Sequence, residues 1–246
     1  MDSPDPAEKK YPSMSPYAAF GNNPLVFTDN SGATLEVAGK VPIALQDIQS
    51  LVPKEYRSQI QLNDQNQIIF KSYDQLPASV KNYESVKLVS DLINSKNNYQ
   101  YNVGDEGKAQ ERDGTVKGVN TNTQRNQANI NFGITNLSVT PRTESDPDLA
   151  PAPGFAGSVR ISEGEFETQG TSGYVNVPRA NIVFHELKEN LIRTEEKKPY
   201  SLTPDGKGGA HEQAGSAGKK AARQVGRSAA GATGEGTDLR FKKTTK

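Results

Sequence analysis

The chain contains two histidines, and the residues around them are the best candidates for chemistry in the sequence. Glu189 follows His185 by four residues, a spacing that places two side chains on one face of a helix. Apolar residues that suit the opposite, core-facing side surround them: Val183, Phe184, Leu187 and Leu191. Because cysteine is absent, any metal site must use histidine and carboxylate side chains. The pattern predicts a helix here and a metal ion held by His185, Glu189 and the later His211.

The expected helix is similar to the H-E-x-x-H helix of zinc peptidases. In that motif two histidines on one face bind zinc, and the adjacent glutamate takes a proton from the metal-bound water. The corresponding residues here are His185, Glu186 and Glu189, so a carboxylate replaces the second histidine. The resemblance implies a zinc ion held by His185, Glu189 and His211 with water in the fourth position. Glu186 would then be the general base.

Two alternatives stay open at this helix. Glu212 or Asp205 can replace Glu189 as the third ligand, because each carries a carboxylate close in sequence to His211. The same string of residues also describes an ordinary amphipathic helix with a solvated charged face, and Glu189 would then be an exposed helix residue.

The rest of the pattern predicts an α+β fold. Helices are expected over 42–52 and from Pro77 to Ser95, because apolar residues recur there at helical spacing. Short antiparallel strands in polar surroundings are expected next, before the H-E-x-x-E helix. The expected strands are 68–70, 99–103, 116–119, 130–134, 137–139, 159–161 and 175–177. Residues 104–128 and 141–154 are polar or proline-rich and predict long loops.

Residues 1–32 are rich in Pro, Asn, Gly and Ser and show no helical periodicity. They contain, in order, Asp5-Pro6-Ala7-Glu8-Lys9-Lys10-Tyr11-Pro12, Ser15-Pro16-Tyr17, Asn22-Asn23-Pro24 and Phe27-Thr28-Asp29. This order resembles the closing segment of the core of bacterial Rhs (rearrangement hotspot) repeat proteins. That segment reads D-P-x-A-E-K-Y-P, S-P-Y, N-N-P and I-D-P-x-G. Asn30 stands where the family has proline, so autocleavage at this point is not implied.

The resemblance implies a polymorphic toxin in which residues 1–32 form a strap of the Rhs core and residues 33–214 form the effector domain. It implies delivery by a contractile secretion system and action inside a target cell. The implied partners are an Rhs shell or secretion apparatus, a cognate immunity protein and a protein substrate. The strand-rich stretch before His185 also resembles metallopeptidase-like tips of Rhs proteins, which favours a peptidase.

Composition sets further bounds on the chain. The net charge is zero, so the whole protein carries no electrostatic signature of nucleic-acid binding. No apolar run approaches the roughly 18 residues of a membrane span, so no span is expected. Residues 215–246 hold eight Lys and Arg against two Asp and Glu, and they are rich in Gly and Ala. This composition predicts a basic, disordered tail.

Two other function classes remain open from the sequence. A nuclease or nucleic-acid-binding toxin is suggested by the basic tail, with His211 and Glu212 available for its chemistry. A non-enzymatic cargo, anchored by the strap in a shell, is the third reading. Metal content separates the peptidase from the cargo, and incubation with DNA, RNA and protein separates the peptidase from the nuclease.

Overall fold

A computed structural model describes residues 34–104, 134–138, 151–200, 202, 208–232 and 239–241. The Rhs-like strap, the expected strand 116–119 and Asp205 lie outside the described residues, as do most of the expected strand 130–134 and of the loop 141–154. Helices and strands both occur, which confirms the α+β class in this coarse form.

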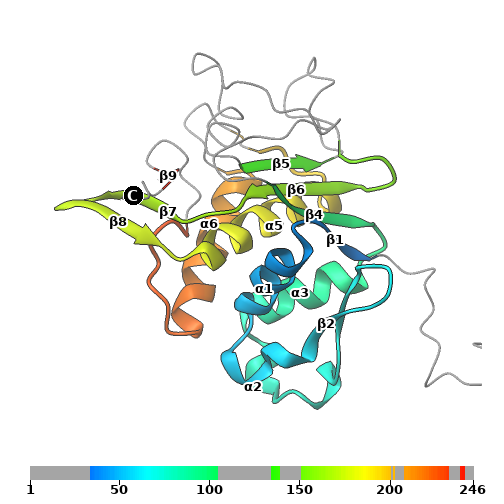
Figure 1. The fold of residues 1–246 in the computed structure, drawn as a ribbon. Coiled ribbons are helices and arrows are strands. Elements are labelled where there is room, and N and C mark those ends of the chain that lie inside the picture. Colours follow the sequence, from blue (N-terminus) through cyan, green and yellow to red (C-terminus); the bar gives the residue numbers. More distant parts are fainter. Residues whose placement is uncertain are drawn as a thin grey trace, which may run out of the picture.

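The main sheet has four strands in the order β1-β4-β6-β5 (Figure 1). They are β1 (Leu35–Gly39), β4 (Tyr99–Gly104), β6 (Gly157–Ser162) and β5 (Ile134–Ser138). β1, β4 and β6 run parallel, and only β5 is antiparallel to its neighbour. The expectation of antiparallel strands was therefore wrong for this sheet. A parallel pair needs a long crossover, and the helices between β1 and β4 provide it.

The crossover from β1 to β4 contains three helices and a hairpin. The helices are α1 (Val41–Leu51), α2 (Ala78–Lys81) and α3 (Glu84–Asn94), joined by the short 3₁₀ turns η3 (Lys54–Gln59) and η4 (Tyr73–Gln75). The hairpin pairs β2 (Ile60–Leu62) with β3 (Ile68–Phe70). The helix expected over 42–52 is confirmed within a residue. The long helix expected from Pro77 is broken between Lys81 and Glu84, where Tyr83 adopts an extended conformation.

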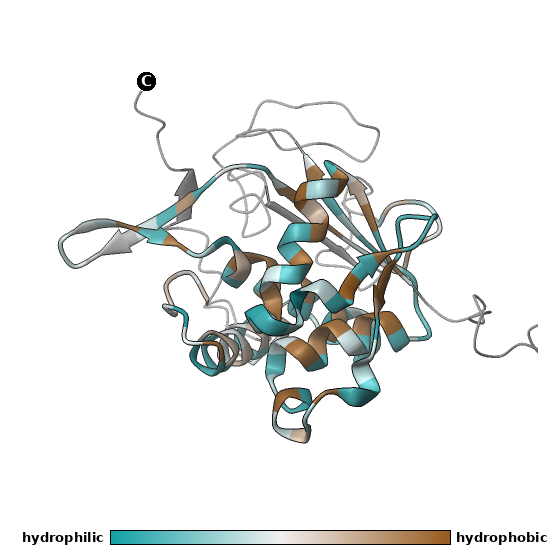
Figure 2. Cartoon of the chain, turned by 60° about the horizontal axis from the view of Figure 1, so that its bottom comes forward, coloured by the Kyte–Doolittle hydropathy of each residue, from teal (hydrophilic) through white to brown (hydrophobic). Residues whose placement is uncertain are grey.

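A second sheet and two long helices complete the described structure. β7 (Phe166–Gly170) pairs antiparallel with β8 (Gly173–Val177) and with β9 (Leu239–Phe241). α5 (Arg179–Glu195) packs on β5 and β6 of the main sheet and on α1, α3 and α6 (Ala210–Gln224). Figure 1 shows these helices on one side of the main sheet. Figure 2 shows hydrophobic and hydrophilic residues side by side along the helices, as is usual for helices that are buried on one face.

α5 is buried almost all round, so it is the central helix of the domain. Its apolar residues belong to the core, but so do seven polar residues, each at most 2% exposed. These are Asn181, His185, Glu186, Glu189, Asn190, Arg193 and Thr194. Gly157 of β6 permits the close approach of this helix to the sheet, since a Cβ there would lie 2.0 Å from the side-chain oxygen of Asn190. A buried helix that carries so many polar groups requires partners for them.

The disordered tail expected from residue 215 is wrong for its first part. α6 continues to Gln224, and Ala214, Gly215, Gly218, Ala221 and Ala222 are buried. These small residues recur at helical spacing, and their lack of side-chain bulk allows close packing of α6 on its neighbours. Alanine and glycine contribute little to an apolar pattern, so this face was not predicted. The packed domain therefore extends at least to Ala232, which is fully buried.

A truncation tests the new boundary. A chain that ends after Ala214 loses most of α6, and we expect it to lose its cooperative unfolding transition. A chain that ends after Phe241 keeps every described element and should unfold like the full protein. Thermal unfolding monitored by circular dichroism distinguishes the two. If the shorter chain unfolds in a native-like transition, the folded domain ends at residue 214, as the sequence predicted.

A buried ion pair joins α1, β4 and α5. Asp47 is 5% exposed and accepts hydrogen bonds from the Arg179 guanidinium at 2.8 and 2.9 Å and from the Tyr101 hydroxyl at 2.6 Å. Arg179 also donates to the carbonyl of Ser162 at the end of β6. Burial and the adjacent Asp47 carboxylate hold the pKa of Tyr101 well above its usual value. This network fixes the first turn of α5 relative to the sheet.

We expect Asp47→Ala to destabilise the protein by about 3 kcal/mol or more, because removing one partner leaves a largely buried guanidinium without its counter-charge. Asp64→Ala, in the exposed β2–β3 turn, is the control and should change the free energy of unfolding by less than about 0.5 kcal/mol. Urea denaturation measures both. A loss below about 1 kcal/mol for Asp47→Ala would show that the network contributes little.

Candidate metal centre

Three side chains from two helices meet beside α5. His185 and Glu189 lie one turn apart on α5, and His211 lies in the first turn of α6. The His185 Nε2 and His211 Nδ1 atoms are 3.1 Å apart. The Glu189 Oε2 atom is 3.0 Å from His211 Nδ1 and 3.5 Å from His185 Nε2. Each of the three residues therefore directs one ligand atom to the same point.

The chain between α5 and α6 positions His211. The backbone N–H groups of Ala210 and His211 donate to the carbonyls of Pro199 and Tyr200, at 3.0 and 3.2 Å. The Tyr200 ring lies over the His211 imidazole, with ring centroids 4.7 Å apart and planes inclined by 33°. The His185 ring meets His211 edge-on, also at 4.7 Å. Two rings therefore contact His211, whose Nδ1 is directed at α5.

Burial and charge are unusual at this cluster. The His185 and Glu189 side chains are fully buried, and only His211, at 14% exposed, reaches the surface. Arg193 Nη1 lies 3.7 Å from the second oxygen of Glu189, and Glu186 is also buried. Two carboxylates and one guanidinium therefore lie close to His185 on α5.

The pKa of His185 reflects the neighbouring carboxylates. Burial by itself lowers the pKa, because it disfavours the charged imidazolium. The hydrogen bond with Glu189 and the negative charges of Glu186 and Glu189 outweigh burial and raise the pKa above its usual value. The same carboxylates would also attract a cation.

The ligand atoms fit one face of a tetrahedron. Metal–ligand bonds of about 2.0–2.1 Å, as for zinc with nitrogen and oxygen, give tetrahedral edges of about 3.3 Å. The three observed edges of 3.0, 3.1 and 3.5 Å scatter about that length. The residues present therefore fit a small divalent ion without rearrangement of the helices. They form the one such group found within the described residues.

The structure settles several expectations about individual residues. It brings together His185, Glu189 and His211, as predicted. Glu189 is buried, so its reading as a solvated helix residue is wrong. Glu212 accepts a hydrogen bond from the backbone N–H of Gly208 and does not belong to the group. Glu186 is buried and acts electrostatically on His185, but it also lies outside the group of ligand atoms.

The sequence analysis missed Arg193 and Asn181. Together with His185 and Glu189 they form a line of buried polar residues spaced by four along α5: Asn181, His185, Glu189 and Arg193. Residues at this spacing share one face of a helix. A continuous polar stripe on a helix that is otherwise rich in apolar residues was the signal available in the sequence.

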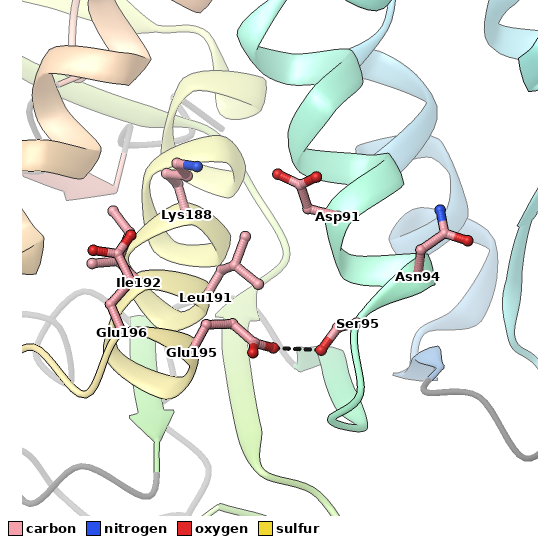
Figure 3. Close-up of a pocket in the computed structure, with 8 residues that line it drawn as sticks. All are labelled: Asp91, Asn94, Ser95, Lys188, Leu191, Ile192, Glu195 and Glu196. Carbon is pink, nitrogen blue, oxygen red and sulfur yellow. Dashed lines mark hydrogen bonds between the residues drawn. The ribbon is translucent and has the colours of Figure 1, made fainter.

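A separate pocket lies between α3 and α5, with a volume of about 320 Å³. Figure 3 shows Glu195 directed toward Ser95, with Asp91 and Lys188 on opposite sides of the opening. Glu195 also accepts a hydrogen bond from the Tyr99 hydroxyl at 2.7 Å. It is lined on this side by Lys188, Leu191, Ile192 and Glu195 of α5 and by the following Glu196, none of which belongs to the His185 cluster. The pocket is therefore not the substrate cleft of that cluster.

Comparison of the chain with models of known protein families, with curated proteins and with solved structures finds no significant match. Within the described residues, no helix has both the length and the apolar character that a membrane crossing requires. The geometry and chemistry of the site are therefore the basis on which a function can be proposed.

Proposed function

We propose that the protein is a zinc-dependent peptidase, with His185, Glu189 and His211 as metal ligands and Glu186 as the general base. One observation carries the proposal. Three ligand atoms, two from α5 and one from α6, converge with the edge lengths of a tetrahedral face. Polar residues buried by chance would not be expected to place three ligand atoms at these distances from one another.

The donor set favours zinc among the common divalent ions. Magnesium and calcium prefer sites built from oxygen ligands, whereas zinc accepts imidazole nitrogen and carboxylate oxygen together. Two histidines and one glutamate match the set found in catalytic sites that keep a fourth position for water. The only partly exposed member is His211, so water and substrate would approach from the side of His211 and Tyr200.

The residues around the ligands have definable roles in such a site. Arg193 lies on the far oxygen of Glu189 and orients the carboxylate. Glu186 would accept the proton of the attacking water and later return it to the leaving amine. Bound zinc supplies a Lewis acid that polarises the scissile carbonyl and lowers the pKa of water. The stacked ring of Tyr200 holds His211 in place.

The biological setting of the proposal is that of a toxin effector. Its basis is the resemblance of residues 1–32 to the end of an Rhs core, with delivery by a contractile secretion system into a target cell. A cognate immunity protein in the producing cell and a protein substrate in the target complete the proposed set of partners. Metal-dependent nuclease chemistry at the same cluster is the competing proposal. The basic surface that a nuclease would use is weak, because Lys220 of α6 forms an ion pair with Glu84.

The metal site itself is tested by zinc content. We expect the wild-type protein to bind one zinc ion, and His185→Ala, His211→Ala and Glu189→Ala each to bind less than stoichiometric zinc, because each removes one of three protein ligands. Glu212→Ala is the matched control and should bind zinc fully. Elemental analysis after dialysis gives the ratio. If the wild-type protein cannot take up zinc, the peptidase proposal fails and the non-enzymatic cargo remains as the alternative.

Zinc affinity should also depend on pH in a defined direction. Protons compete with metal for imidazole, and the pKa of His185 is raised. Affinity should therefore begin to fall at a higher pH than an ordinary histidine would cause, and it should continue to fall as the pH decreases. Titration with zinc between pH 5.5 and 8.5 measures this. An affinity that stays constant below pH 7 would argue against neutral His185 as a ligand.

Catalysis is tested separately from metal binding. Glu186→Gln keeps the size of the side chain but removes the base, so zinc should stay bound while turnover falls by about 10² to 10⁴. Glu196→Gln, at the exposed end of the same helix, is the control. Cleavage of an unfolded casein is the assay, with single-stranded DNA and RNA as parallel substrates. Cleavage of nucleic acid without cleavage of protein would favour the nuclease.

A further inference from the structure

The pocket between α3 and α5 is lined by charged groups that the fold itself does not use. Asp91 and Lys188 lie on opposite sides of the opening, and Figure 3 shows their side chains directed toward one another. Neither side chain forms a hydrogen bond or an ion pair with another of the described residues. Part of the wall between them is apolar, because the buried Leu191 and Ile192 contribute to it. The opening therefore presents one negative group, one positive group and an apolar surface.

Glu195 brings a fixed carboxylate to the same pocket. Its Oε1 atom accepts hydrogen bonds from the Ser95 hydroxyl, from Asn97 Nδ2 at 3.2 Å and from the Tyr99 hydroxyl at 2.7 Å. Its Oε2 atom has no hydrogen-bond partner among the described residues. Burial by itself would raise the pKa of Glu195, but the three hydrogen bonds outweigh burial and lower the pKa. Glu195 is therefore an ionised carboxylate that is held in place through one oxygen and has the other available.

The size and the lining of the pocket restrict the ligand. Pockets that bind small molecules usually measure about 300 to 1,000 Å³, so this cavity of about 320 Å³ suits a small ligand. The carboxylates of Asp91 and Glu195 attract a cationic group and repel a phosphate. A simple cation would leave Lys188 without a partner. A small zwitterion with an apolar side chain satisfies the carboxylates, the ammonium group of Lys188 and the apolar wall together.

We propose that this pocket binds a free α-amino acid with an aliphatic side chain. Asp91 and Glu195 accept hydrogen bonds from the ammonium group of the ligand, and Lys188 donates to its carboxylate. The aliphatic side chain packs on Leu191 and Ile192. None of these residues belongs to the candidate metal centre, so the binding of the amino acid does not depend on zinc.

A series of ligands that each lack one group tests this complementarity. L-leucine has all three groups, isopentylamine lacks the carboxylate, isocaproate lacks the ammonium group and glycine lacks the aliphatic side chain. Isothermal titration calorimetry with the full, metal-free chain should show saturable binding of leucine. Each of the other compounds should bind at least about 10-fold more weakly, because each loses a charge-assisted hydrogen bond or the apolar contact. Absence of leucine binding at millimolar concentrations, or equal binding of isopentylamine, would overturn the proposal.

Two substitutions assign the charged groups of the ligand to the protein. Lys188→Gln should weaken leucine binding by about 10-fold or more and leave the affinity for isopentylamine undiminished. Asp91→Asn should weaken leucine binding similarly and leave the affinity for isocaproate undiminished. Lys54→Gln, exposed in η3, is the control and should bind leucine like the wild type. Because neither Asp91 nor Lys188 holds another side chain in place, both variants should fold, which circular dichroism establishes. A folded Lys188→Gln protein that binds leucine with unchanged affinity would contradict the assignment.

The amino-acid site and the peptidase proposal fail in different ways. If the metal-free protein binds leucine but the wild type cannot take up zinc, the peptidase proposal fails and the amino-acid site stands. If zinc binds stoichiometrically and leucine does not bind, the metal site stands and the amino-acid site fails.

Discussion

The enclosed negative charge of Glu189 is the constraint on which the site and the packing around it depend. A buried carboxylate is expensive unless positive charge and hydrogen-bond donors surround it. Here the compensation comes from Arg193 on one oxygen and from two imidazoles on the other. Arg193 and His185 belong to α5 itself, so His211 is the group that has to be brought to this helix, and α6 and the Tyr200 segment position it.

The same constraint explains why α5 has no solvent-facing side of the usual kind. Its apolar residues meet the sheet and α1, while its polar stripe meets α6. The buried pair of Asp47 and Arg179 fixes the start of the helix, and Gly157 lets the far end approach β6. Polar groups on a buried helix need specific partners, and so they also determine how the helix is oriented.

The sequence predicted the part of the site that depends on local geometry. His185 and Glu189 are four apart in a helix, and this relation holds whatever surrounds the helix. His211 was included in the predicted site only because it is the second of the two histidines in the chain. Arg193 was not predicted, although it lies four residues after Glu189 on the same face of the helix. The partners of Asn181, the carbonyls of Ser228 and Ala230, could not be predicted, because they lie far along the chain. The parallel strands and the Ala- and Gly-rich face of α6 were missed for another reason: alternation indicates a strand but not its direction, and small residues carry little periodic signal.

The link between Asp47 and Arg179 joins residues 132 positions apart, and β1 pairs with a strand that lies beyond three helices. Contacts between distant parts of a chain are slow to form, because loop closure costs entropy before the contact contributes stability. α1 cannot reach its final packing until α5 has left the ribosome. The amino-terminal half of the domain therefore has to wait, incompletely packed, for the carboxyl-terminal half to be synthesised.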